Sequence, residues 1–83
     1  MEIKVLGSGC AKCKQLFAAA EKAIADAGRP ARLSKVEAME EIVAYGVMRT
    51  PALVIDGRVV SSGTIPSAAE IVSMITTAAA RQP

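Results

Sequence analysis

The sequence predicts a small α/β fold, in which a four-stranded mixed sheet carries helices on both faces. Apolar residues alternate with strand spacing in some segments and recur with helical spacing in others. An Asp-Gly pair between two β-branched runs is typical of a tight hairpin. The expected order is strand, helix, strand, helix, hairpin and helix. With 83 residues, the chain can build one modest core, so residues 1–83 are expected to form a single domain.

The first part of the chain is predicted to be a strand–helix–strand unit. Glu2–Leu6 alternates as a strand does, and Cys10–Ala27 has helical spacing up to Gly28, a natural helix end. Ala31–Val36 is the second strand. A helix between two strands implies a right-handed crossover and therefore a parallel strand pair. The apolar residues of this helix that recur at helical spacing are Cys13, Leu16, Phe17, Ala20, Ile24 and Ala27.

A short helix and a hairpin are expected next. Glu37–Tyr45 has helical spacing, and Leu53–Ile55 and Arg58–Val60 have the β-branched composition of strands. Asp56-Gly57 joins the two strands, and both residue types tolerate the positive φ of a type I′ turn. The short helix is expected to direct three side chains inward, namely those of Met39, Ile42 and Val43.

A capping sequence predicts the start of a final helix. Ser67-Ala68-Ala69-Glu70 has the spacing of a capping box, in which the serine and glutamate side chains bond each other's backbone N–H groups. The segment Ala79–Pro83 is expected to fray. The inner face of the helix is predicted to consist of Ile71, Met74, Ile75 and Ala78.

Composition and charge argue against two classes of partner. The formal charge of +2 is mild, and no basic stripe is interleaved with aromatic residues, so no nucleic acid partner is expected. No apolar run is long enough to cross a bilayer, so no membrane partner is expected either. Because the first six residues are too short and too alternating for a signal peptide, the expected location is cytoplasmic.

The only two cysteines, Cys10 and Cys13, stand three positions apart where a strand ends and a helix begins. In a reducing cytosol, a C-x-x-C pair points to redox or metal chemistry rather than to a structural disulfide. The closed loop would also be very short, and short loops gain least from cross-linking. The chain has no histidine, which excludes Cys-His catalysis and zinc sites with His ligands.

With these motifs in view, the chain resembles thioredoxin-fold proteins, and most closely the short glutaredoxin-like group of thioredoxin-like small redox-active disulfide proteins. The resemblance is carried by Gly7–Lys14, Tyr45–Gly57 and Ser62–Ser67. It implies a thioredoxin-like fold and a cis bond between Thr50 and Pro51, packed against Cys10. That cis bond would let the backbone of Thr50 pair with an extended partner peptide.

The resemblance also implies a thiol–disulfide oxidoreductase with a redox-active Cys10–Cys13 disulfide. A thiolate at Cys10 would be favoured by the helix N-terminus and nearby lysines, so Cys10 is the expected nucleophile. Cys13, one turn further along, is the expected resolving thiol. Neither a cofactor nor a metal is expected for this chemistry. The implied partners are disulfide-containing protein substrates and a flavin-dependent thioredoxin reductase or another dithiol donor.

Four further residues are assigned supporting roles. Gly9, Ala11 and Lys12 surround the cysteines, and Lys12 is expected to lower the pKa of Cys10. Arg49 is expected to flank the docking groove. The motif departs from the family's usual pattern, because Gly9 stands where an aromatic residue is common and Ala11-Lys12 where a proline is common. The buried acid that assists the second cysteine in thioredoxin has no obvious counterpart.

Two other functions remain open from the residues alone. The two thiolates could bind a soft metal or metalloid, since ferredoxin-like metallochaperones also place C-x-x-C between a strand and a helix. A structural zinc site would need two more ligands, from a second subunit for instance. The chain could also be an interaction module on a thioredoxin scaffold without redox activity, because a fold does not fix a function.

Overall fold

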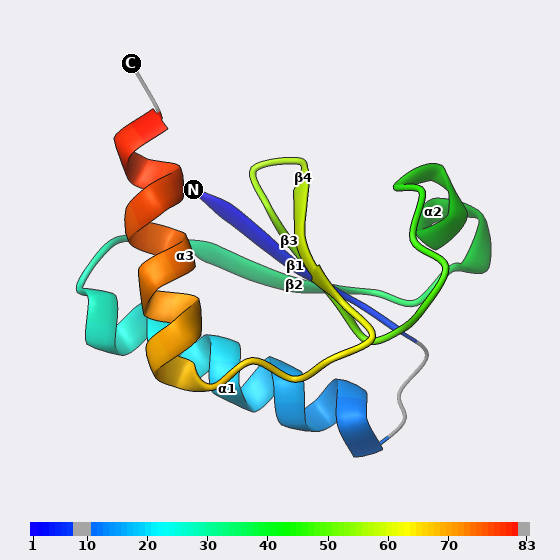
Figure 1. Cartoon of the computed structure of the whole chain (residues 1–83), viewed down its shortest axis with the longest axis horizontal. Coiled ribbons are helices and arrows are strands. Elements are labelled where there is room, and N and C mark those ends of the chain that lie inside the picture. The colour runs from blue at the N-terminus through cyan, green and yellow to red at the C-terminus, as the bar shows by residue number, and fades with distance from the viewer. Residues whose placement is uncertain (8–10, 82–83) are drawn as a thin grey trace.

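Seven elements follow one another along the chain in the predicted order, as Figure 1 shows in the computed structural model, which describes residues 1–7 and 11–81. The strands are β1 (Glu2–Leu6), β2 (Arg32–Val36), β3 (Ala52–Ile55) and β4 (Arg58–Ser62). The helices are α1 (Ala11–Ala27), α2 (Met39–Ala44) and α3 (Ala68–Arg81). In the described part of the chain, none of these helices combines the length and apolarity needed to span a bilayer.

The four strands form one mixed sheet in the order β2-β1-β3-β4. The pair β1–β2 is parallel, as the crossover predicts, whereas β1–β3 and β3–β4 are antiparallel. The hairpin turn has the positive φ values that the Asp-Gly pair predicts, 49° at Asp56 and 81° at Gly57. The Asp56 N–H donates to the Glu2 carbonyl at 2.7 Å, and the Glu2 N–H donates to Asp56 Oδ1 at 2.8 Å. These bonds tie the hairpin tip to the start of β1.

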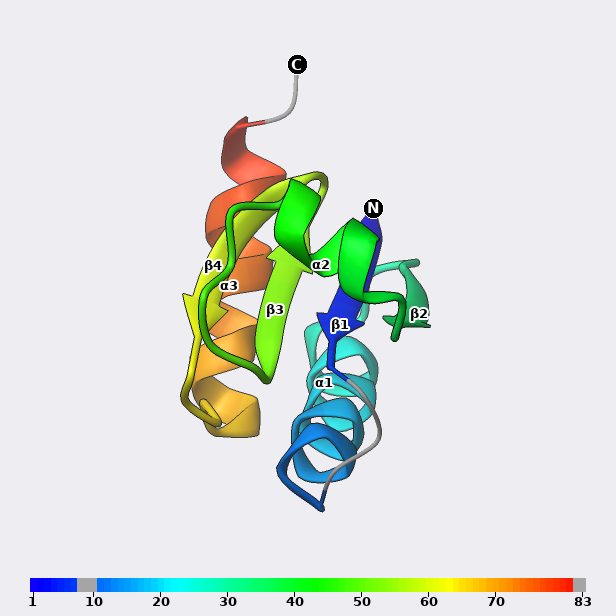
Figure 2. The ribbon, with the colours of Figure 1, turned by 90° about the vertical axis from the view of Figure 1, so that its right-hand side faces the viewer.

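The larger core lies on the sheet face that α1 and α3 cover, side by side (Figure 2). Both helices are amphipathic, so they bury an apolar stripe and expose their charged residues. Alanines at positions 20 and 23 are fully buried in α1 and leave room for close packing. The buried members of this cluster are Ile3, Val5, Leu16, Ala20, Ala23, Leu53, Ile55, Ile71 and Ile75.

A second, smaller core lies on the opposite sheet face, beneath α2. Ile42 and Val47 bury their side chains there against alternate residues of the strands. Tyr45 packs at its edge and accepts a hydrogen bond from Lys4 Nζ at 3.1 Å. That bond and the charge distribution around Tyr45 raise the pKa of Lys4 above its ordinary value of 10.5. The sheet therefore has helices on both faces, as predicted.

Details of α2 and α3 differ from the prediction. The expected inward positions of Met39 and Val43 are wrong, because these side chains are 65% and 63% exposed. Only Ile42 of the three is buried, and Tyr45 and Val47 fill the remaining space beneath α2. At the other end, α3 continues to Arg81, past the expected start of fraying at Ala79, and residues 82–83 lie outside the described residues.

Candidate functional site

The first turn of α1 positions Cys13, whose side chain is only 6% exposed. No acidic residue lies in that turn, so nothing there offsets the partial positive charge of the helix N-terminus. Ala11 and Lys12 lie in the same turn and are exposed to solvent. The predicted site residues Gly9 and Cys10 lie outside the described residues, so the Cys10–Cys13 disulfide stays a prediction.

Gly7 leaves the space that the Cys13 side chain occupies. A Cβ atom on Gly7 would collide with Cys13 Sγ and would lie 3.4 Å from Cys13 Cβ. The Gly7 N–H donates to the Val36 carbonyl at 2.9 Å, which fixes this backbone at the end of the sheet. The glycine is therefore required by the close approach of the sulfur, a reason that the sequence motif alone does not reveal.

Two cationic residues line a small cavity beside Cys13. A cavity of about 10 Å³ is lined by Val5, Gly7, Cys13, Lys14 and Lys35. It has space for about one water molecule. Lys35, from β2, also holds its Nζ atom 4.8 Å from the centre of the Phe17 ring. Lys14 and Lys35 therefore bring cationic side chains to the lining of the cavity beside Cys13.

Sequence reasoning missed Lys35. It stands in an otherwise ordinary strand, and only the parallel pairing of β2 with β1 brings it opposite Val5, next to the start of α1. The signal that could have found it is the predicted β1–β2 pairing, because parallel strands place their carboxyl ends at the same edge of the sheet.

The predicted Thr50-Pro51 motif lies next to the cysteine motif, and the two approach each other at Gly7. The bond between Thr50 and Pro51 is cis, as the resemblance implies. Thr50 is exposed, whereas Pro51 is fully buried at the start of β3. The Thr50 Cβ lies 3.8 Å from the position that a Cβ on Gly7 would take. The structure thus brings Thr50 and the first turn of α1 together around one glycine.

Arg49 lies beside this loop, against the turn after β4. A Cβ on Gly63 would lie 3.1 Å from both Cβ and Cδ of Arg49, so the arginine stem crosses that turn closely. The Gly63 N–H donates to the Pro51 carbonyl at 2.9 Å, which links the turn to the cis-proline loop. Two apolar side chains nearby in the sequence are exposed, Met48 at 95% and Ile65 at 37%.

The described residues contain no cluster of three or more His, Cys, Asp or Glu that could hold a metal ion. The surroundings of Cys13, in contrast, have several features that thiol chemistry requires. Cys13 lies in the first turn of α1, Lys14 and Lys35 line the cavity beside it, and the exposed residue Thr50 approaches the same glycine as Cys13 does. A helix N-terminus of this kind can stabilise a thiolate.

Comparison with known proteins agrees with this geometry. A family model described as a thioredoxin domain matches residues 1–76. A thioredoxin from Methanothermobacter thermautotrophicus is 34% identical over 71 residues, which cover 86% of this chain and 92% of that protein. A thioredoxin from Methanocaldococcus jannaschii is 38% identical over 69 residues, which cover 83% of this chain and 79% of that protein.

Proposed function

The chain belongs to the thioredoxin domain family of thiol–disulfide oxidoreductases, and we propose that it reduces disulfides of partner proteins through Cys10 and Cys13. One observation carries the proposal beyond the family. Cys13 lies in the first turn of α1 against Gly7, and Thr50 approaches the same glycine. The cysteine helix and the cis-proline loop are therefore neighbours, as a thiol exchange site beside a peptide-docking loop requires.

The proposed cycle transfers two electrons to the partner. The Cys10 thiolate attacks one sulfur of the partner disulfide, forms a mixed disulfide and releases the first partner thiolate. The Cys13 thiolate then attacks the Cys10 sulfur, closes the Cys10–Cys13 disulfide and releases the second partner thiolate. A flavin-dependent thioredoxin reductase or another dithiol donor returns two electrons and restores both thiols.

Both attacking groups must be charged, and the residues around them support this. A thiol with pKa ~8.5 is only a few per cent ionised at pH 7, whereas a pKa of ~7 makes about half of it thiolate. The start of α1 and Lys12 would lower the pKa of Cys10. Lys14 and Lys35, which line the cavity at Cys13, would add positive charge beside the buried resolving thiol.

Docking of the partner is proposed at Thr50 and Pro51. Thr50 is an exposed residue, and its backbone would pair with an extended segment of the substrate, so that main-chain hydrogen bonds supply affinity. Arg49 would flank the groove with its charge, and Gly9 and Ala11 would leave access to Cys10. The proposed setting is the cytoplasm, where reduced thiols are maintained.

Serine variants test the two cysteines separately. With dithiothreitol as the electron donor and a disulfide-bonded protein as substrate, Cys10→Ser should lose reduction activity. Cys13→Ser should still attack but should stop at the mixed disulfide, which non-reducing electrophoresis and mass spectrometry detect. Ala11→Ser is the matched control, because it places a serine between the two cysteines and leaves both thiols intact.

The proposal fails if Cys10→Ser reduces the substrate as fast as the unaltered protein. It also fails if protein purified without chelator carries a stoichiometric soft metal that both serine variants lose, since that result supports metal binding instead. Applied to a cell extract, the Cys13→Ser variant should retain the physiological substrate on Cys10 for identification.

A further inference from the structure

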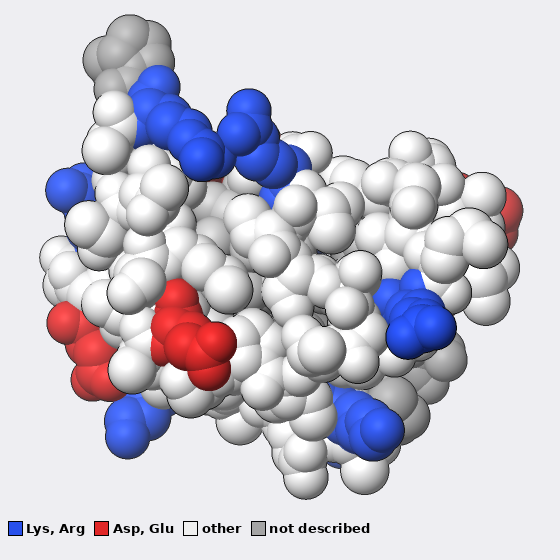
Figure 3. Space-filling model, viewed as in Figure 1, with Lys and Arg blue, Asp and Glu red and all other residues white. Residues whose placement is uncertain are grey.

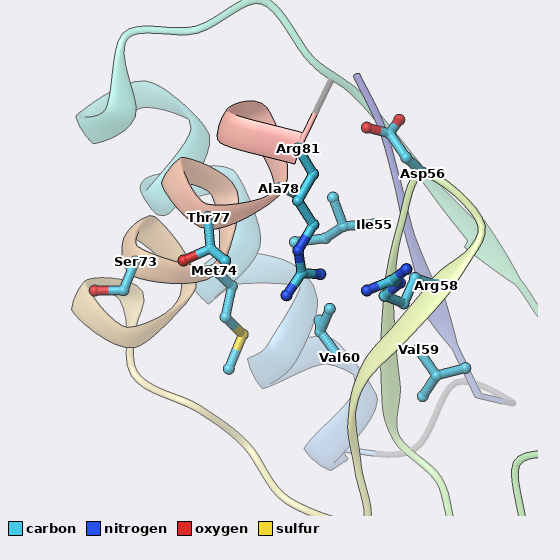
Figure 4. A pocket seen from close by; sticks show the side chains of 10 residues that line it. All are labelled: Ile55, Asp56, Arg58, Val59, Val60, Ser73, Met74, Thr77, Ala78 and Arg81. Atoms are coloured by element: carbon cyan, nitrogen blue, oxygen red, sulfur yellow. The ribbon is translucent and has the colours of Figure 1, made fainter. Parts of the chain in front are cut away.

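We propose a second binding site, for a small organic anion with an apolar body, in the groove between β4 and α3. The groove has a volume of about 520 Å³, within the range of small-molecule sites. Its floor is apolar and consists of Ile55, Val60, Met74 and Ala78. Figure 4 shows these side chains between the hairpin and the last turns of α3.

Two guanidinium groups lie above the apolar floor. Arg58 comes from β4 and Arg81 from the last turn of α3, and their side chains point toward each other in Figure 4. Figure 3 shows basic side chains gathered at this end of the molecule, over the hairpin tip and the end of α3. Like charges in one groove repel each other, and a shared anion would relieve that repulsion.

Within residues 1–7 and 11–81, no carboxylate forms an ion pair with either arginine. Asp56 is the acidic residue of the groove lining, and its carboxylate points away from both guanidinium groups in Figure 4. That carboxylate accepts the hydrogen bond from the Glu2 backbone instead. Charge complementarity therefore points to an anionic ligand that binds both guanidinium groups.

The end of α3 accounts for the placement of Arg81 but not for that of Arg58. Arg81 in the last turn of α3 interacts favourably with the helix dipole, and its stem can cover apolar surface. Arg58 lies at the start of strand β4 and not at a helix end, yet it lines the same groove. An anion that accepts forked hydrogen bonds, such as a carboxylate or a phosphate monoester, fits both groups.

This site is separate from the thiol site. The groove adjoins the hairpin tip, which pairs with the start of β1 at Glu2 and Ile3. Gly7 and Cys13 lie beyond the opposite end of β1. Four residues of strand separate the two ends, on the order of 13 Å. Ligand binding in the groove should thus leave thiol exchange intact, and failure of either proposal is separately detectable.

The experiment uses three eight-carbon probes, namely octanoate, octyl phosphate and the neutral alcohol 1-octanol. Each is titrated into isotope-labelled protein while the NMR signals of Val60, Met74 and Ala78 are followed. At least one anion should shift these signals with an affinity at least about tenfold above that of octanol. Whichever anion binds more tightly identifies the head group as carboxylate or phosphate.

Charge-removing variants assign the binding to the groove. Arg58→Gln and Arg81→Gln should each weaken binding of the anion about tenfold, because each removes one charge-assisted contact. Arg29→Gln is the control, since it removes the same charge from an exposed position outside the groove lining. Disulfide reduction by all three variants should equal that of the unaltered protein, which also verifies that they fold.

Four results would overturn the proposal. Octanol could bind as tightly as both anions, or neither anion could bind at millimolar concentration. The shifts could map outside the groove. Finally, Arg58→Gln and Arg81→Gln could bind the anion as well as Arg29→Gln does.

Discussion

Gly7 is the residue on which the packing of the thiol site depends. Its backbone is buried between the end of β1 and the first turn of α1, and Cys13 Sγ occupies the space beside its Cα atom. Any side chain at this position displaces the sulfur or the helix turn that carries it. The requirement has two sources, namely the close approach of the Cys13 sulfur and a positive φ of 157°, which residues with a side chain rarely adopt.

We therefore expect Gly7→Ala to lower the free energy of unfolding by about 1–3 kcal/mol, the usual cost of overpacking a filled site. The cost should shrink in a Cys13→Ala background. With the sulfur removed, the nearest atoms to the new Cβ would be Cys13 Cβ at 3.4 Å and Thr50 Cβ at 3.8 Å, which are ordinary contacts. Urea denaturation of the four proteins gives the coupling energy directly.

Gly28→Ala is the control for this cycle. Nothing lies within 4 Å of a Cβ at that position, so the alanine meets only the cost of its positive φ of 66°. That cost should be the same with and without Cys13→Ala. A Gly7→Ala penalty that is equally independent of Cys13 would show that the sulfur does not set the requirement.

Among the elements, α3 is fixed at its start by two reciprocal hydrogen bonds. The Glu70 N–H donates to Ser67 Oγ at 3.2 Å, and the Ser67 N–H donates to Glu70 Oε1 at 3.2 Å. This is the capping box that the sequence predicts. The cap follows the turn at Gly63 that bonds the Pro51 carbonyl, so it helps to hold the proposed docking loop in place.

Ser67→Ala should therefore cost about 1 kcal/mol of unfolding free energy, because it leaves the Glu70 N–H without its acceptor. Ser73→Ala is the matched control, at an exposed position inside the same helix. It should change stability by less than about 0.5 kcal/mol and in the stabilising direction, since alanine is the better helix former. Equal losses in the two variants, measured by urea denaturation, would contradict the capping role.

The elements also show what sequence reasoning can and cannot supply. The hairpin turn at Asp56-Gly57 and the helix cap at Ser67 were predictable, because each depends on the residue type at that position. In α2, by contrast, six residues give too few turns for a clear apolar stripe. The inward face was misassigned at Met39 and Val43 because Tyr45 and Val47, beyond the helix, fill the core beneath it.

For the whole molecule, the strand–helix–strand crossover made the parallel β1–β2 pair predictable. The neighbours of Cys13 were not predictable in the same way. Gly7, Lys35 and Thr50 come from three different segments, and only the assembled sheet brings them to one helix turn. Family resemblance supplied the cis-proline motif and the predicted β1–β2 pairing could have pointed to Lys35, but the role of Gly7 required the three-dimensional structure.

The sheet has a core on each face, and the two share every strand that they contact. Leu53 and Ile55 belong to the larger core, whereas Ala52 and Val54, on the same strand, belong to the smaller one. Neither core can be lost without disordering the strand that supports the other. The protein should therefore unfold as one cooperative unit, as small domains usually do.

Leu16→Ala tests this cooperativity. Leu16 is fully buried in the larger core, so the substitution should cost about 2–5 kcal/mol. Tyr45, the chain's single tyrosine, packs against the smaller core on the opposite face and reports on that side through its fluorescence. The Tyr45 transition in urea should shift as far as the transition seen by far-UV circular dichroism.

Val43→Ala, at an exposed position, is the control, and it should change the stability measured by either transition by no more than about 0.5 kcal/mol. If Leu16→Ala moved the circular dichroism transition and left the Tyr45 transition in place, the two faces would be independent units.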